Sequence, residues 1–240
     1  QNLPEAPYAD KDAQLMETYF QKVLGVEQVV LAVNDEVSGF FFDDMFNTQN
    51  GALAQAVIPG QTDIFVYYSG HGIPNKDGSK TYLFPSDGRV ERLDIQGYEI
   101  EKFYANLAKL NAKSVTVILD ACFSGASRTT EKIDVQNLIA AKGIKLTVKK
   151  PWEAYDNFTV INSSTGEETS LGYDDAEFGL FTYYLAAGMK ERADADKDRK
   201  ITLAELKDYV IKNVTDMSKR IRGQQTPEFY GNMNQVLFEY

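Results

Sequence analysis

Cysteine and histidine are the scarcest reactive residues of this chain, with one of each among its 240 residues. A single cysteine excludes an intrachain disulfide and a zinc site built from several cysteines. No apolar run approaches the roughly 20 residues that cross a bilayer, and no signal segment is evident, so the sequence predicts a soluble chain without a membrane partner and leaves its compartment open. Basic charge is also in deficit, because 25 Lys and Arg stand against 35 Asp and Glu. The resulting net charge of −10 disfavours nucleic acid as a partner.

What the chain does contain suffices for one large domain, since 43% of its residues are hydrophobic. Short β-branched or aromatic runs alternate with amphipathic segments. This order predicts an α/β fold with a mostly parallel central sheet and helices on both faces. The predicted strands are Val29–Val33, the run from Asp63 to His71, Thr81–Pro85 after a hairpin turn at Asn75–Gly78, the run from Val115 to Cys122, and Phe158–Ser164. The predicted helices are Ala13–Leu24, Glu36–Ala56, Ile100–Leu110, Phe178–Lys190 and Leu203–Ile221.

Two of these strands end in the only histidine and the only cysteine, His71 and Cys122. Alone, either residue is more often structural than catalytic. Both, however, precede glycine-bearing turns, and the carboxyl ends of parallel strands share one sheet edge, so we expect the two side chains to sit on turns and to meet. A thiol beside an imidazole is an activated nucleophile, with His71 as its base. Gly70, Gly72 and Gly125 let backbone approach a substrate carbonyl, and the N–H groups of Gly72 and Cys122 are the candidate oxyanion hole.

The segments YYSGHG (Tyr67–Gly72) and DACFSG (Asp120–Gly125) resemble the caspase-like cysteine peptidases, the clan of caspases, metacaspases and paracaspases. Further matches are YADKDA (Tyr8–Ala13), INSSTGEETS (Ile161–Ser170) and FGLFTYYL (Phe178–Leu185). The resemblance implies a caspase-like (caspase-hemoglobinase) fold and a single peptidase domain over residues 1–240. Members of the clan normally start with a hydrophobic strand ahead of the YADKDA-like segment, and this usual first strand is expected to be lacking here. Phe123 also departs from metacaspases, which commonly carry His after the nucleophile.

Asp120 is the feature that predicts the substrate. It lies two residues before the nucleophile, on the same side of the strand, and should line the primary specificity pocket, where a carboxylate attracts Arg or Lys. Asp-Ala-Cys is similar to metacaspases and their bacterial relatives, whereas caspases carry Gln-Ala-Cys and cut after aspartate. By this resemblance the pocket also includes Ser69 and an acidic residue, Asp12 or its competitor Asp10. The alternative role for these two aspartates is to cap the helix that follows.

The sequence thus predicts a cysteine endopeptidase that cleaves peptides or proteins after Arg or Lys and needs no cofactor for its chemistry. Two alternatives stay open: a legumain-like, asparagine-specific peptidase or ligase, and a non-proteolytic interaction module of the same fold. The oligomeric state is also open. Residues 126–156 form a long connection that in this clan is often cleaved on activation, and we expect self-cleavage there, although exposed lysines are ordinary. Its basic residues are Arg128, Lys132, Lys142, Lys145, Lys149 and Lys150.

A second pattern, DADKDRKITLAE, follows the ligand spacing of an EF-hand loop. Its acidic and hydroxyl residues at positions 1, 3, 5, 9 and 12 are Asp194, Asp196, Asp198, Thr202 and Glu205. Arg199 occupies the sixth position, where glycine normally makes a sharp turn, and a solvated loop is the alternative. Calcium is therefore the candidate cofactor of this loop, and resemblance to metacaspases separately raises calcium activation.

Overall fold

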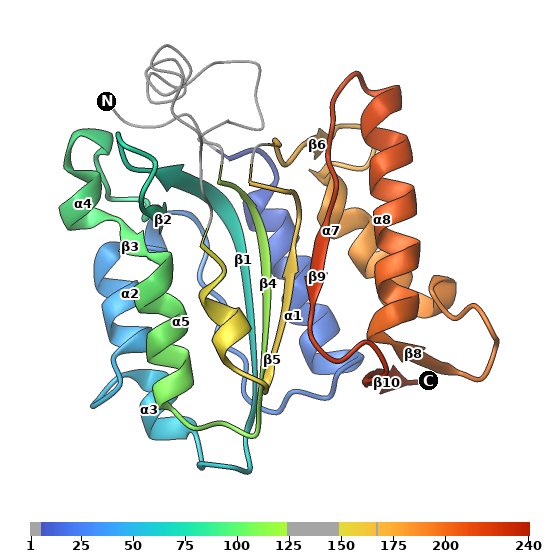
Figure 1. Ribbon diagram of the computed structural model, residues 1–240, viewed down its shortest axis with the longest axis horizontal. Coiled ribbons are helices and arrows are strands. Elements are labelled where there is room, and N and C mark those ends of the chain that lie inside the picture. The colour runs from blue at the N-terminus through green and yellow to red at the C-terminus, as the bar shows by residue number, and fades with distance from the viewer. Residues whose placement is uncertain (1–5, 124–148, 167) are drawn as a thin grey trace.

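The computed structural model describes residues 6–123, 149–166 and 168–240 (Figure 1). A six-stranded sheet runs through it in the order β3-β2-β1-β4-β5-β9. The three central strands are parallel and the outer pairings are antiparallel, so the predicted α/β fold is confirmed, with a parallel core in a mixed sheet. The strands are β1 (Asp63–Pro74), β2 (Thr81–Leu83), β3 (Tyr98–Glu99), β4 (Ser114–Cys122), β5 (Phe158–Asn162) and β9 (Glu228–Tyr230).

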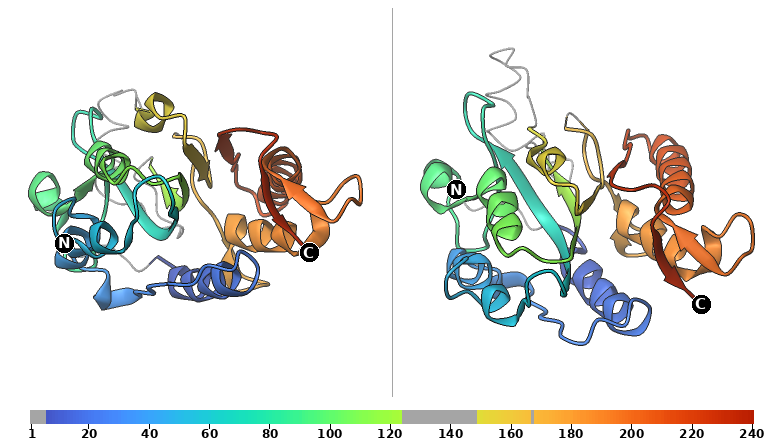
Figure 2. Two further views of the ribbon diagram at one scale, coloured as in Figure 1. Left: turned by 90° about the horizontal axis from the view of Figure 1, so that it is seen from below. Right: turned by 60° about the horizontal axis from the view of Figure 1, so that its bottom comes forward.

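Helices cover both faces of the sheet, with α1 and α7 on one side and α5 on the other (Figure 2). Successive residues of β4 enter opposite cores, since Val117 and Leu119 pack with α2 and α5 whereas Ile118 packs with α1, α7 and α8. The helices are α1 (Ala9–Lys22), α2 (Gly39–Phe46), α3 (Ala52–Ala56), α4 (Leu93–Gln96), α5 (Ile100–Lys109), α7 (Leu180–Ala187) and α8 (Leu203–Arg220). Two small sheets pair β6 (Gly172–Tyr173) with β7 (Phe178–Gly179), and β8 (Lys200–Thr202) with β10 (Val236–Glu239). No helix in the described ranges is long and apolar enough to cross a membrane.

The segment Val29–Val33 is not the strand that its sequence predicts. It runs without helix or strand structure beside a cavity of about 770 Å³ that also borders β1. Residues of both cores line this cavity, Met16 and Phe20 from one and Phe42 and Phe46 from the other, so it lies in the plane of the sheet. A strand needs a neighbour for its backbone hydrogen bonds, and across the described residues no strand pairs with this segment.

Two helix predictions also need correction. The predicted helix Glu36–Ala56 is interrupted between α2 and α3, because the Asn47 side chain accepts hydrogen bonds from the backbone N–H groups of Gln49 and Asn50 at 2.9 and 3.3 Å. Such local bonds compete with the helical ladder. Helix α1 begins at Ala9 rather than Ala13, after Tyr8 in a left-handed conformation with φ 67°. Asp10 and Asp12 therefore lie inside the first helical turn and do not cap it.

Candidate active site

The strands β1 and β4 bring the histidine and the cysteine together. They pair in parallel from Asp63 with Ser114 to His71 with Cys122, so the two reactive residues are register partners. Side chains of register partners on neighbouring strands leave the sheet on the same face, which puts the imidazole beside the thiol. The prediction that His71 sits on a turn is wrong. The strand continues to Pro74 because Gly72–Pro74 pair with β2, whereas Cys122 is the last residue of β4.

Ser170 covers the nucleophile. The Ser170 backbone N–H donates to Cys122 Sγ at 2.8 Å, and the thiol lies 3.4 Å from the Ser170 carbonyl oxygen. Cys122 itself is 3% exposed. The N–H bond suits a thiolate and the bond to the carbonyl oxygen suits a protonated thiol, so the Ser170 backbone can hold the sulfur in either form. In the sequence Ser170 belongs only to the family match Ile161–Ser170, because nothing in the spacing of its residues predicts that it contacts Cys122.

The glycine after the histidine is required by a close approach. A Cβ at Gly72 would lie 2.6 Å from Phe123 Cδ1 and 3.0 Å from the Cys122 carbonyl oxygen. Phe123, where metacaspases commonly have His, is buried and fills this space. Gly70 is similarly crowded, since a Cβ there would lie 2.7 Å from the Tyr68 hydroxyl. Gly125 lies outside the described residues.

Asp120 is fully buried behind the nucleophile. Its carboxylate accepts hydrogen bonds from the hydroxyl of Ser170 and from that of Thr182, the latter at 2.6 Å. The Thr182 hydroxyl also lies 2.6 Å from the Tyr67 hydroxyl. Residues from β1, α7 and the loop after β5 therefore hold this carboxylate in place. The sequence does not identify any of the three, Tyr67, Thr182 or Ser170, as a site residue.

Asp12 joins the same group of residues. Its carboxylate, also fully buried, accepts a hydrogen bond from Ser69 Oγ at 3.0 Å and another from the Gly179 N–H at 2.8 Å. Ser69 is in turn the register partner of Asp120. The structure thus brings Asp12, Ser69 and Asp120 together, whereas Asp10 remains partly exposed on α1. Two buried carboxylates around one serine suit a cationic ligand group.

The long connection after the nucleophile is described only at its end. Residues 126–148, which carry Arg128, Lys132, Lys142 and Lys145, lie outside the described ranges. Of the remaining basic residues, Lys149 pairs with Glu101 at 2.6 Å and Lys150 with Glu228 at 3.2 Å. Both lysines are exposed, so these pairs contribute little to stability.

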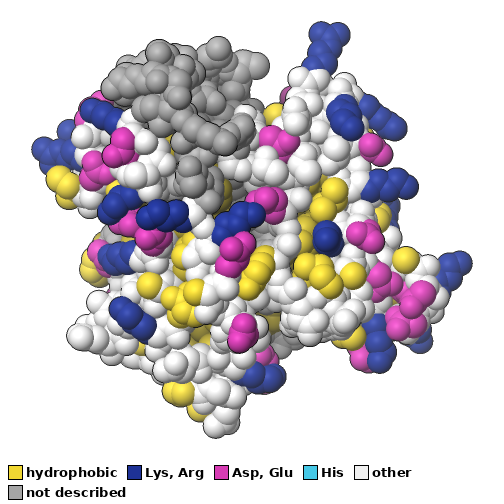
Figure 3. Space-filling model, viewed as in Figure 1, with side chains coloured by type: hydrophobic (Ala, Val, Ile, Leu, Met, Phe, Trp, Pro, Cys, Tyr) yellow, Lys and Arg dark blue, Asp and Glu magenta, His cyan; other side chains and the backbone are white. Residues whose placement is uncertain are grey.

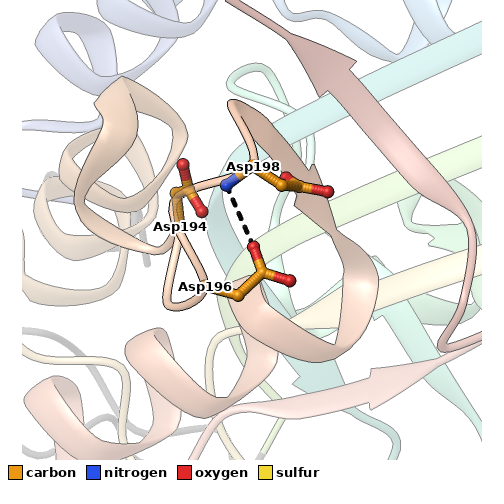
Figure 4. A group of neighbouring side chains, drawn as sticks. All are labelled: Asp194, Asp196 and Asp198. Carbon is orange, nitrogen blue, oxygen red and sulfur yellow. Dashed lines mark hydrogen bonds between the residues drawn. The ribbon is translucent and has the colours of Figure 1, made fainter.

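The acidic loop before β8 has part of the geometry of a cation site (Figure 4). Asp194, Asp196 and Asp198 each offer one carboxylate oxygen within 4.8 Å of the others. Arg199 adopts φ 67° without the expected glycine. Glu205 fits less well, because its carboxylate accepts hydrogen bonds from the N–H groups of Thr202 and Ala195 at 3.0 and 3.1 Å.

Hydrogen bonding lowers the pKa of two carboxyl groups of this loop. The Tyr240 hydroxyl donates to Asp194 at 2.7 Å, which holds the pKa of Asp194 below its usual value and raises the pKa of Tyr240 to about 12. The Thr202 N–H likewise lowers the pKa of Glu205. Acidic and basic side chains lie side by side in this region of the surface (Figure 3). The loop lies beside β8, far from the carboxyl ends of β1 and β4, so a cation bound there would not touch the reacting atoms (Figure 1).

Comparisons with known proteins agree with this arrangement. The family model of the caspase domain, Peptidase C14, matches residues 1–239. No curated protein matches the chain. Among solved structures, protein GSU0716 from Geobacter sulfurreducens has the same fold, with a TM-score of 0.61 at 17% identity over 95% of this chain and 88% of that one. His71 and Cys122 are register partners, and the buried Asp120 lies two residues before the cysteine. Because the family match also covers nearly the whole sequence, the chain belongs to the caspase-domain family of cysteine peptidases.

Proposed function

We propose that this protein is a cysteine endopeptidase that cleaves peptide bonds after Arg or Lys. The observation that carries the proposal is the pair of buried carboxylates, Asp12 and Asp120, on either side of Ser69 and next to Cys122. A guanidinium or ammonium group entering between them would meet negative charge in surroundings where water screens it weakly. Arg fits best, since its planar fork can donate to two carboxylate oxygens at once.

The chemistry follows from the two register partners. His71 takes the thiol proton, and the Cys122 thiolate attacks the carbonyl carbon of the residue in the pocket. The N–H groups of Gly72 and Cys122 stabilise the oxyanion that develops. His71 then gives its proton to the leaving amine, which departs as the new N-terminus. Water activated by the same imidazole hydrolyses the acyl-enzyme and restores the thiol.

The pocket also argues against the two alternatives. An asparagine side chain would leave both carboxylates without a counter-charge, which penalises a legumain-like specificity. An interaction module without activity has no need of a buried cysteine that receives an N–H bond opposite the histidine. A peptide or protein with Arg or Lys at the cleaved bond is therefore the proposed partner.

We also propose self-cleavage in the connection after the nucleophile. Arg128, Lys132, Lys142 and Lys145 match the proposed specificity. Purified wild-type chain should then convert to two fragments while Cys122→Ala stays intact. Equal cleavage of both would exclude it.

The test of the proposed function is hydrolysis of fluorogenic peptides that end in Arg, Lys, Asp or Asn, with and without calcium. We expect turnover of the Arg and Lys peptides by the wild type and none by Cys122→Ala or His71→Ala. Turnover of the Asp or Asn peptide in preference would exclude the role given to Asp120. If calcium stimulates the wild type and no longer stimulates Asp194→Asn, the acidic loop has a part in activation.

A further inference from the structure

Gln225 lies after α8, remote in sequence from every residue of the proposed mechanism, and yet its side chain contacts Ser170, whose hydroxyl bonds the Asp120 carboxylate. It is fully buried. The amide nitrogen Nε2 donates to the Ser163 carbonyl oxygen at 2.9 Å and to Ser170 Oγ at 3.4 Å. The amide oxygen Oε1 accepts from the Leu171 N–H at 2.9 Å. The Gln225 side chain thus bonds both the start of the loop after β5, at Ser163, and its later part, at Ser170 and Leu171, which covers the nucleophile.

The hydrogen-bond directions at Ser170 explain why this matters. A serine hydroxyl has one proton and two lone pairs. By accepting from Gln225, Ser170 Oγ keeps its own proton for Asp120, to which it donates. The backbone of Ser170 meanwhile contacts Cys122 Sγ. Ser170 therefore orients the Asp120 carboxylate and also contacts the Cys122 sulfur. Gln225 holds Ser170 in this position.

Gln225 is itself held firmly from α8. Its backbone N–H donates to Ser218 Oγ at 3.2 Å, and its carbonyl oxygen accepts from Thr215 Oγ1 at 3.3 Å. The neighbouring residues support the same loop from outside, since Gln224 Nε2 and the Thr226 N–H both bond the Glu168 carboxylate, at 2.9 and 2.6 Å. Through these bonds α8 and the residues that follow it support the loop that carries Ser170.

We infer that Gln225 is a positioning residue for substrate specificity, acting through Ser170 on the Asp120 carboxylate. This inference rests on the proposed function, because it concerns how well that carboxylate meets an arginine or a lysine. Arginine binds through two donors of fixed geometry, whereas lysine offers a flexible point charge. A displaced Asp120 should therefore lose more binding of arginine than of lysine.

The experiment compares kcat/KM for otherwise identical Arg and Lys peptides in four proteins: wild type, Gln225→Met, Ser170→Ala and Gln224→Met. Gln225→Met keeps the shape of the side chain and removes its polar atoms. Ser170→Ala removes only the hydroxyl between Gln225 and Asp120 and leaves the bonds to Ser163 and Leu171, so it gives an answer even when Gln225→Met does not fold. Gln224→Met is the matched control, because Gln224 bonds Glu168 and not Ser170.

We expect the Arg-to-Lys ratio of kcat/KM to fall about tenfold in Gln225→Met and in Ser170→Ala, as expected for the loss of one buried hydrogen bond, chiefly through KM for the Arg peptide. The ratio should stay within about twofold of wild type in Gln224→Met, the range of context effects on a surface bond. A merely structural role lowers kcat/KM for the Arg and Lys peptides equally. An unchanged ratio in folded Gln225→Met or in Ser170→Ala therefore overturns the inference. Turnover of the Arg and Lys peptides by the wild type upholds the proposed function in that case. If the wild type cleaves neither peptide, the proposed function fails and the inference fails with it.

Discussion

Replacing Asp120 by Asn tests whether the buried carboxylate recognises charge or only supports the fold. The two side chains have the same shape. The hydroxyl groups of Ser170 and Thr182 each donate to one carboxylate oxygen. In the variant one hydroxyl still donates to the amide oxygen and the other can rotate to accept from the amide nitrogen, so the fold should be retained. What the substitution removes is the negative charge.

The size of the effect follows from Coulomb's law. A charge pair at about 4 Å with an effective dielectric constant of about 20 is worth about 4 kcal/mol. That free energy corresponds to roughly a thousandfold change in kcat/KM. Asp12 keeps its charge in the variant, and we therefore expect a loss of about a hundredfold to a thousandfold for the Arg peptide.

The assay measures kcat/KM for peptides that end in arginine or in citrulline, its neutral analogue of nearly the same shape. The loss should be confined to the arginine peptide. Asp208→Asn serves as the matched control, because Asp208 is exposed on α8 and takes no part in the hydrogen bonds around Asp120. It should change neither value by more than about twofold. Equal losses for arginine and citrulline in Asp120→Asn would refute the reasoning, since Asp120 would then act only through the structure.

Other predictions concern stability. Gly72→Ala should lower the free energy of unfolding by about 1–3 kcal/mol in urea titrations, because the new methyl group collides with Phe123; an unchanged midpoint would contradict that close approach. Thr202→Ala removes the cap of α8 and should cost about 1 kcal/mol by the same assay. Because the folded pKa of Asp194 is depressed, its bond to Tyr240 stabilises the fold above the unfolded pKa near 4 and is lost as pH falls further. Tyr240→Phe should therefore lower the melting temperature at neutral pH and converge with wild type in acid, and a difference that persists in acid would oppose this. Fusing a seven-residue apolar strand to the N-terminus should raise the melting temperature by filling the cavity beside β1, whereas a fusion of the same length with Asp at alternate positions should not.

The central sheet and the meeting of His71 with Cys122 could be predicted from sequence because their signals are local. A β-branched run predicts a buried strand from its own composition, and the unique His71 and Cys122 each end such a run. The failure at Val29–Val33 has the same origin, since the run has strand composition but pairs with no strand in the part of the chain that the structure describes. A strand is defined by its neighbours and not by its own residues.

The residues that sequence reasoning missed are polar groups that act through long-range contacts. From the sequence alone, Thr182 is an ordinary helix residue and Gln225 an ordinary loop residue. Only the fold shows that they bond Asp120 and Ser170. The sequence predicts Asp12 as a helix cap or a pocket residue. The start of α1 at Ala9 excludes the cap, and only the packing of α1 against β1 reveals the bond from Ser69. Pairings between distant segments have no sequence period, so a single sequence does not reveal them.

The most direct measurement is covalent labelling with a peptide that carries an electrophilic ketone after arginine, followed by intact mass and peptide mapping. The account predicts one adduct per chain, on Cys122, which is absent in Cys122→Ala, strongly slowed in His71→Ala and prevented by an excess of a peptide ending in arginine. Labelling at another residue, or labelling of Cys122 that proceeds equally fast without His71, would contradict a cysteine nucleophile activated by its register partner.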